Sequence, residues 1–271
     1  MIPEATIKSL ARRQGIDPAV IDRDHALGVV LWAMDSQSSL QDWVFKGGTC
    51  LRKCHFGDYR FSEDLDFTVT GRLGGATARV AIASCASAAA SQGIQLMLDE
   101  MRVEVMDDDH GRESIEIKVP YRGALRMGSA QNVQFHLCAD EDLAFEPVIL
   151  PLLHPYADAS GLECQVRAYA LEEILTEKLR AVAGQRRHAV ARDIYDIASL
   201  VRRGADADAA LSALPRKARY KGVDLSDAAA RFHAREVEYE ASWDRTLAYL
   251  VVDDLRFRDA FSIAADLLGR L

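Results

Sequence analysis

The spacing of hydrophobic and polar residues changes near residue 155 of the 271-residue chain. Before that point, short segments alternate apolar and polar positions. Ile115-Glu116-Ile117-Lys118-Val119 is the clearest case, and such alternation is typical of a strand with one buried face. From Arg167 onward the spacing is helical and strand signals are sparse. The pattern therefore predicts a sheet domain with N-terminal helices over residues 1–158 and a helical domain over residues 159–271.

The first domain is expected to mix helices and strands. Asp17 as N-cap and Pro18 at the first helical position indicate the start of a helix that continues to about residue 36. Helices are also predicted over 4–14, from Thr49 and over 76–92. Strands are predicted over 43–45, 61–70, 94–105, 114–121, 132–139 and 147–153. The predicted fold class is α+β, with a mixed sheet and flanking helices followed by a C-terminal helical bundle.

The second domain is expected to contain helices only, over 167–183, 187–203, 207–213, 225–237, 241–253 and 257–270. One straight helix through 167–203 would hold Lys178 and Asp196 roughly 27 Å apart, at 1.5 Å per residue. Gly184-Gln185 offers a break in that helix. We therefore predict a hairpin that brings Lys178 to Asp193 and Asp196, which share one helical face.

Composition and charge are those of an ordinary soluble globular protein, with 27% charged and 49% hydrophobic residues. The net charge of −8 gives no overall attraction for a polyanion, so any RNA contact depends on local basic groups. Two such groups stand out, each weighed against a merely solvated surface. They are Arg186, Arg187, His188 and Arg192, and the run Arg216, Lys217, Arg219, Tyr220 and Lys221.

The five cysteines are scattered, which favours a reducing cytoplasm over a disulfide framework. Cys50, Cys54 and His55 lie close together, but no second ligand pair at zinc spacing follows, so buried thiols are favoured over a zinc site. No signal peptide is evident at the N-terminus. The most apolar segment, 76–90, is too short and too polar to span a bilayer. A cytoplasmic protein without membrane contact is expected.

The chemistry of the chain is concentrated in two stretches. Gly47-Gly48-Thr49 follows a short strand, and such glycines let backbone N–H groups approach a phosphate closely. Asp64 and Asp66 alternate with Leu65 and Phe67, so both carboxylates project from one face of a strand. Two neighbouring carboxylates repel each other unless a divalent cation lies between them. The combination indicates phosphoryl or nucleotidyl transfer.

These motifs resemble the nucleotidyltransferase-fold superfamily, and more specifically the AbiEii/AbiGii toxin family. Phe45-Lys46-Gly47-Gly48-Thr49 and Arg60-Phe61-Ser62-x-Asp64-Leu65-Asp66-Phe67 carry the resemblance in the first domain. Leu175-Thr176-Glu177-Lys178-Leu179-Arg180 and Arg192-Asp193-Ile194-Tyr195-Asp196 carry it in the second. The resemblance implies a toxin that transfers NMP from an NTP to an acceptor, with Mg²⁺ (or Mn²⁺) as cofactor. The 3′ end of tRNA is the leading acceptor, and a cognate antitoxin encoded nearby is implied.

The resemblance also implies roles for individual residues. Asp64 and Asp66 are expected to hold the metal, and Lys178, Asp193 and Asp196 to take part in catalysis from the helical domain, which would complete the active-site cleft. The expected nucleotide-binding residues are Gly47, Gly48, Thr49, Arg60, Ser62 and Arg192. For Arg60 the alternative is bracing the Asp64 strand, and for Ser62 it is capping that strand.

One residue departs from the family pattern. A third acidic residue is expected on a neighbouring strand, but His136 stands at that position. Glu116 or Asp140 could substitute for it, or the metal could keep an extra water. The departure leaves two rivals open. One is NMP transfer to a protein or small molecule, and the other is a nucleotide-binding regulator without turnover.

Overall fold

A computed structural model describes residues 2–37, 40–107, 113–125, 130–139, 141–247, 249–251 and 254–271. The chain divides into two compact units. The first holds residues 2–107, 113–141 and 147–168, and the second holds residues 142–146 and 169–271. Within the described ranges, no helix combines the length and the apolar character needed to cross a membrane.

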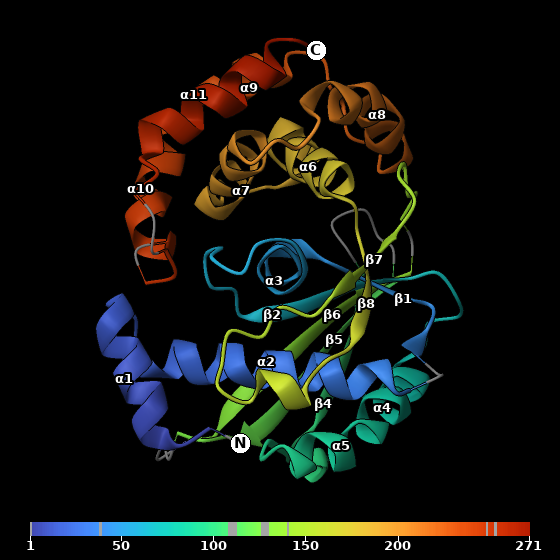
Figure 1. Cartoon of the computed structure of the whole chain (residues 1–271). Helices are drawn as coiled ribbons and strands as arrows, with labels where there is room; N and C mark the ends of the chain where they lie inside the picture. Colours follow the sequence, from blue (N-terminus) through green and yellow to red (C-terminus); the bar gives the residue numbers. More distant parts are fainter. Residues whose placement is uncertain are drawn as a thin grey trace. The chain divides into compact units, whose positions relative to one another are not determined.

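A mixed sheet forms the core of the first unit (Figure 1). Its strands are β1 (Trp43–Lys46), β2 (Asp64–Val69), β3 (Gln95–Leu96), β4 (Arg102–Asp107), β5 (Glu113–Arg122), β6 (Gln131–Cys138), β7 (Val148–Pro151) and β8 (Gln165–Ala168). They lie in the order β3-β5-β6-β2-β1-β8-β7, and β4 also pairs with β5. The pairs β2–β6 and β1–β8 are parallel, and the other pairs are antiparallel. The predicted mixed sheet is confirmed.

Alternation along the strands gives this sheet one apolar and one polar face. Leu65, Phe135 and Ile117 are Cα partners across β2, β6 and β5, and all three are fully buried. The next row on the opposite face is Asp66, His136 and Glu116. Because side chains repeat every second residue, the register that buries the first row also aligns the second.

Helix α2 (Pro18–Asp35) packs on this sheet and contacts β6 and β8. Its start is as predicted, because the Asp17 carboxylate accepts a hydrogen bond from Ala19 N–H at 2.7 Å. The other helices of the first unit are α1 (Glu4–Gln14), α3 (Gly47–Cys50), which continues as a π-helical turn over Leu51–His55, α4 (Gly75–Ser84) and α5 (Ala86–Ser91). Figure 1 shows α2 running across the strands of this unit.

The second unit is helical, apart from residues 142–146. Its helices are α6 (Leu171–Arg180), α7 (Ala191–Arg202), α8 (Ala207–Tyr220), α9 (Ala228–His233), α10 (Glu236–Leu247) and α11 (Phe257–Leu268). Helix α6 packs against α7 and α8, and α7 packs against α10 and α11. Helix α8 is thus longer than predicted, and the predicted helices over 225–237 and 241–253 are replaced by α9 and α10 with different boundaries.

Two strand predictions and one helix prediction were inaccurate, and one strand was missed. Strand β2 is shorter than 61–70, the predicted strand over 94–105 is split into β3 and β4, and the predicted helix over 76–92 is interrupted at Cys85. Residues 167 and 168 were predicted to begin a helix, but they belong to β8. Pairing with β1 and β7 determines their conformation, since tertiary context overrides local preference in short segments. The first unit consequently extends beyond residue 158, to Ala168.

Candidate active site

The turn between β1 and α3 is built for close approach of backbone to side chains. Gly47 has φ of +78°, which favours glycine, and a Cβ there would overlap the Asp66 carboxylate. A Cβ on Gly48 would lie 2.6 Å from Arg60 Nη2 and 3.0 Å from Ser62 Oγ. Glycine is therefore required at Gly47, Gly48 lies close against Arg60 and Ser62, and five of the predicted site residues meet at this turn.

Thr49 connects the turn to the aspartate strand. Its side chain is fully buried, and its hydroxyl donates to the backbone carbonyl of Asp64 at 2.5 Å. The hydroxyl thus fixes the start of β2 relative to the helix N-terminus. Thr49, in the first helical turn, remains one of the residues predicted to bind the nucleotide, together with Gly47 and Gly48.

Asp64 and Asp66 project from the polar face of the sheet, as the alternation predicts. Asp66 is the Cα partner of Lys46 on β1, and Asp64 is the Cα partner of Gln134 on β6. The Asp66 side chain is 29% exposed, so its carboxylate is accessible to a ligand. Leu65 and Phe67, between and after the aspartates, are buried in the core.

His136 occupies the position next to Asp66 on β6. Its Nδ1 lies 3.1 Å from Asp66 Oδ1, and its Nε2 lies 2.8 Å from Gln134 Nε2. Partial burial lowers the pKa of His136, but the hydrogen bond to Asp66 and the charges of Asp66 and Asp64 outweigh burial and raise it. The His136 imidazole therefore lies beside the Asp64 and Asp66 carboxylates. It occupies the position at which the family pattern has a third acidic residue.

Glu116, one alternative for that acid, lies one strand further along the row. Its carboxylate accepts a hydrogen bond from Gln134 Nε2 at 3.0 Å and forms an ion pair with Lys118. Gln134 thus connects Glu116 to His136. Asp140, the other alternative, lies outside the described residues.

Arg60 is buried, with 3% of its surface exposed, and its Nη1 donates to the carbonyl of Phe61 at 3.0 Å. Its guanidinium lies against Gly48, so a fixed positive charge supports the turn from within the protein. Ser62 is also buried and lies against Gly48.

In the second unit, the predicted hairpin is confirmed. Gly184 has φ of +151° and ends the helical segment after α6, and α7 returns alongside it. Lys178 Nζ lies 2.7 Å from Asp193 Oδ1 and 2.9 Å from Asp196 Oδ2. These two aspartates are almost fully buried, whereas the lysine is 15% exposed.

Arg186, one of the basic residues that the sequence places near this pair, completes the cluster. Its Nε lies 2.7 Å from Asp193 Oδ2. Burial alone would raise the pKa of Asp193, but the charges of Lys178 and Arg186 hold it below its ordinary value. Arg192, predicted to bind nucleotide, lies in the first turn of α7 and is partly exposed.

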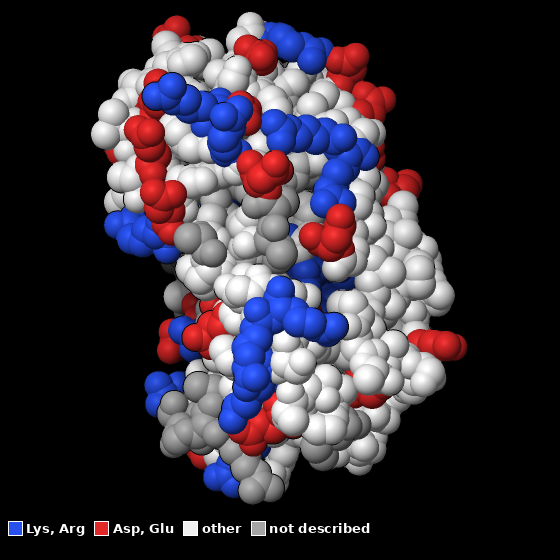
Figure 2. Space-filling model, turned by 60° about the vertical axis from the view of Figure 1, so that its left-hand side comes forward, with Lys and Arg blue, Asp and Glu red and all other residues white. Residues whose placement is uncertain are grey.

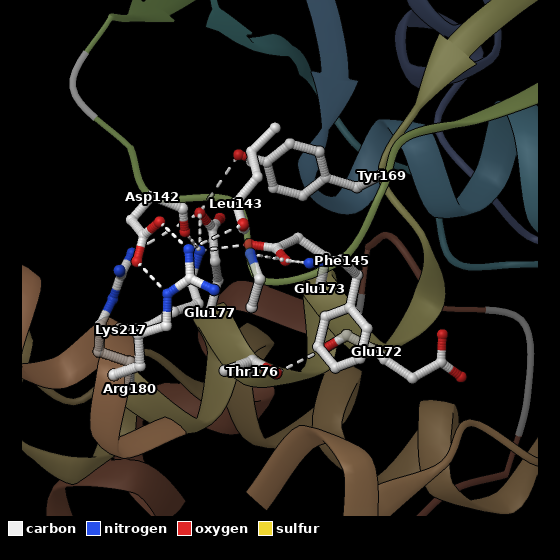
Figure 3. A network of polar contacts seen from close by, with 12 residues as sticks. Asp142, Leu143, Phe145, Tyr169, Glu172, Glu173, Thr176, Glu177, Arg180 and Lys217 are labelled. Carbon is white, nitrogen blue, oxygen red and sulfur yellow. Dashed lines mark hydrogen bonds and ion pairs between the residues drawn. The ribbon is translucent and has the colours of Figure 1, made fainter. Parts of the chain in front are cut away.

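The basic run near residue 217 was weighed as an RNA contact, and for two of its residues that interpretation is wrong. Lys217 is fully buried and Lys221 is 3% exposed. Lys217 instead pairs with the buried carboxylate of Glu173 and donates to the Asp142 carbonyl at 2.9 Å (Figure 3). On the face drawn in Figure 2, Lys and Arg side chains lie in short runs with Asp and Glu beside them.

Comparison with solved structures identifies the fold as that of a nucleotidyltransferase toxin. MenT4, a nucleotidyltransferase toxin of Mycobacterium tuberculosis H37Rv, is similar with a TM-score of 0.71 and 20% sequence identity. The match covers 100% of this chain and 91% of that one. The model of the AbiEii nucleotidyl transferase toxin family, of Type IV toxin–antitoxin systems, matches residues 30–263, and the chain belongs to this family. No curated protein sequence matches the chain.

Proposed function

We propose that this toxin transfers NMP from an NTP to the 3′-hydroxyl of an RNA, with the 3′ end of tRNA as the leading acceptor, so that translation stops. The observation that carries the proposal is the packing of the Asp66 carboxylate against Gly47, with Asp64 on the same face of β2. The turn predicted to bind phosphate and the pair of carboxylates thus lie at one place in the first unit. That combination suits chemistry on a nucleoside triphosphate.

The residues present fit a divalent cation. Asp64 and Asp66 are accessible carboxylates on one strand face, and hard cations such as Mg²⁺ prefer oxygen ligands. These two residues would hold Mg²⁺ or Mn²⁺, which when bound neutralises charge on the phosphates and helps to orient the attacking hydroxyl. His136 and Glu116 lie in the same row of side chains as Asp66, next to the proposed metal ligands.

The chain's own groups bind and position the nucleotide. The N–H groups of Gly47, Gly48 and Thr49 open a helix and would donate to phosphate oxygens. Arg60, buried against Gly48, would add a positive charge that stabilises the triphosphate without contacting solvent. The acceptor oxygen would then attack the α-phosphorus, a bond to the α-phosphate would form, and pyrophosphate would leave.

We further propose that the second unit contributes to this reaction through Lys178. Two buried aspartates hold its ammonium group from two sides, which limits its side-chain freedom. An immobilised ammonium is suited to contact a phosphate. Asp193 would hold Arg186 and Lys178 in place. Arg192, the residue before Asp193, would add a positive charge for nucleotide binding. We propose a cytoplasmic location and control by an antitoxin encoded nearby.

The test is incubation of the full chain with each α-labelled NTP and Mg²⁺, with and without total tRNA. Label on RNA supports the proposal, label on the protein or on a small molecule supports transfer to those acceptors, and NTP binding without transfer supports a regulator. Asp64→Ala should abolish transfer, whereas Asp99→Ala, which removes an exposed carboxylate of the same unit, should not. Transfer that survives in Asp64→Ala would refute the site assignment.

A further inference from the structure

A second cluster of metal-ligand side chains lies in the first unit, built from α2 and from the segment after β7. Their donor atoms, one from each of His25, His154 and Asp158, all lie within 4.8 Å of one another. His25 Nε2 is 2.9 Å from Asp158 Oδ2, and His154 Nε2 is 3.2 Å from Asp158 Oδ1. The side chains of the two histidines are 0% and 2% exposed, and that of Asp158 is 14% exposed.

The fold holds the His154 ring in this position. Gly28 lies one helical turn after His25, on the same face of α2. A Cβ on Gly28 would overlap His154 Nδ1, so glycine leaves the space that the ring fills. On the other side of the segment, the Leu153 N–H donates to the carbonyl of Lys53 at 2.7 Å. The His154 imidazole is thereby fixed with Nε2 toward the carboxylate.

Hydrogen bonding alone leaves this cluster incomplete. Both imidazoles direct Nε2 at a single carboxylate, and the Nδ1 atoms of His25 and His154 are buried with no hydrogen-bond partner in the described part of the chain. Buried polar groups are normally satisfied, and a half-satisfied network is less favourable than an apolar core. Two buried imidazoles and one carboxylate, with one donor atom from each lying within 4.8 Å of the others, form a donor set that a metal ion can bind.

The donor set and its spacing suit zinc. Tetrahedral zinc with bonds of about 2.0–2.1 Å places neighbouring donor atoms about 3.3 Å apart. The distances of 2.9 and 3.2 Å join the two imidazole nitrogens to different oxygens of Asp158, so each ring lies near that spacing from the one carboxylate. Imidazole nitrogen also selects zinc over magnesium or calcium. We propose that His25, His154 and Asp158 bind one Zn²⁺, with water in the fourth position, and that this ion fastens the segment after β7 to α2.

The surrounding charges leave room for a cation. Lys53, whose charge acts on both histidines, is held by Asp24 at 2.7 Å from Nζ to Oδ2, and Asp24 also holds Arg52 at 2.7 Å from Nε to Oδ1. Asp22, also buried, adds a second carboxylate close to His25. With Asp158, carboxylates outnumber basic side chains around the cluster. Asp158 is 14% exposed, so one member of the cluster reaches solvent.

The first experiment measures metal content in the full chain purified without a polyhistidine tag. We expect about one zinc per chain by mass spectrometry after dialysis, and a thermal midpoint that rises by several degrees when zinc is restored to chelated protein. His154→Asn and Asp158→Asn should each lose the zinc and its effect on the midpoint. His188→Asn, which changes an exposed histidine, should keep both.

Two further measurements separate the proposal from its rivals. Zinc-edge X-ray absorption of the wild-type protein should show nitrogen and oxygen ligands only, whereas sulfur ligands would place the ion at one or more of the cysteines and overturn the proposal. Circular dichroism shows whether each variant is folded, so that a folded His154→Asn protein that retains zinc would also overturn it. Wild-type protein that neither contains zinc nor gains stability from it would do the same. None of these readouts depends on nucleotidyl transfer.

Discussion

Asp66 and His136 face each other across the parallel strands β2 and β6, with Asp66 Oδ1 3.1 Å from His136 Nδ1. The pair places an imidazole directly beside the carboxylates that are proposed to hold the metal. Gln134 fixes the other side of the ring at 2.8 Å, so the imidazole orientation is set by two contacts. Since ligand type influences metal choice, this pair is expected to affect which cation supports activity.

We predict that His136→Asp shifts the metal preference toward Mg²⁺. A carboxylate suits Mg²⁺, whereas imidazole suits softer cations. The ratio of kcat/KM with Mg²⁺ to that with Mn²⁺ should rise by about tenfold, which corresponds to about 1.4 kcal/mol. Transfer assays at saturating metal would measure this ratio. The control is His188→Asp, which makes the same change at a histidine that is not a proposed metal ligand. An unchanged ratio would show that His136 does not influence the metal.

Gly47→Ala is expected to lower transfer by at least about tenfold. The substitution strains a left-handed backbone by about 1–2 kcal/mol and also displaces the Asp66 carboxylate, which lies where the new methyl group would be. The measurement is kcat/KM together with the thermal midpoint.

The matched control for Gly47→Ala is Gly57→Ala, because the nearest atom to a Cβ there is Leu153 Cδ1 at 4.0 Å. That variant should retain transfer close to the wild-type rate. Equal activity in both variants would mean that the close approach of Gly47 to Asp66 has no role in the reaction.

Much of the site was predictable because its determinants are local. Alternation along residues 114–119 and around Asp64 and Asp66 set the faces of the strands, and Asp17-Pro18 marked the start of α2. Gly184 marked the break that brings Lys178 to Asp193 and Asp196. In each case a few consecutive residues carry the physical cause, so one sequence suffices.

Other features depend on partners far away in the chain. Residues 165–168 are a strand because β7 pairs with all four of them, and because β1, more than a hundred residues earlier, pairs with Ala168 through Phe45. Lys217 looks like part of a basic surface run, but its burial depends on Glu173, 44 residues away. His25 and Asp158 are 133 residues apart. Spacing along the sequence contains no signal for such contacts.

Lys178→Met is expected to destabilise the protein by about 3–5 kcal/mol at pH 7, because it leaves buried carboxylates with less compensation. The folded pKa of Asp193 is held below its ordinary value of 3.8, so its favourable pairing is fully present above that pH and is lost as the pH falls through the folded pKa. The stability difference between wild type and variant should therefore shrink below about pH 4. Urea unfolding at neutral and acidic pH would measure it, and a difference that grows on acidification would contradict the sign.

The final prediction concerns residues 142–146, which are held to the second unit by a buried ion pair (Figure 3). Glu173 Oε2 accepts the N–H groups of Ala144 and Phe145, each at 2.9 Å, and Glu173 Oε1 pairs with Lys217. Lys217→Met should cost about 3–5 kcal/mol, because it leaves the Glu173 carboxylate buried without its cation. The same variant should be cut faster than wild type at residues 142–146 by a protease.

Arg216→Ala tests whether burial is the reason for that cost. Arg216 binds the same segment through Asp142, but its side chain is 59% exposed, so its loss should cost less than about 1 kcal/mol. The double variant Glu173→Leu/Lys217→Leu should lose less stability than the sum of its single variants, because neither charge remains buried alone. Urea unfolding of Lys217→Met, Arg216→Ala, the double variant and its two single variants measures these differences. An interaction between Glu173 and Lys217 must appear as non-additivity when both are removed, so additive losses would show that the buried pair does not hold the segment. Equal losses for Lys217→Met and Arg216→Ala would show the same.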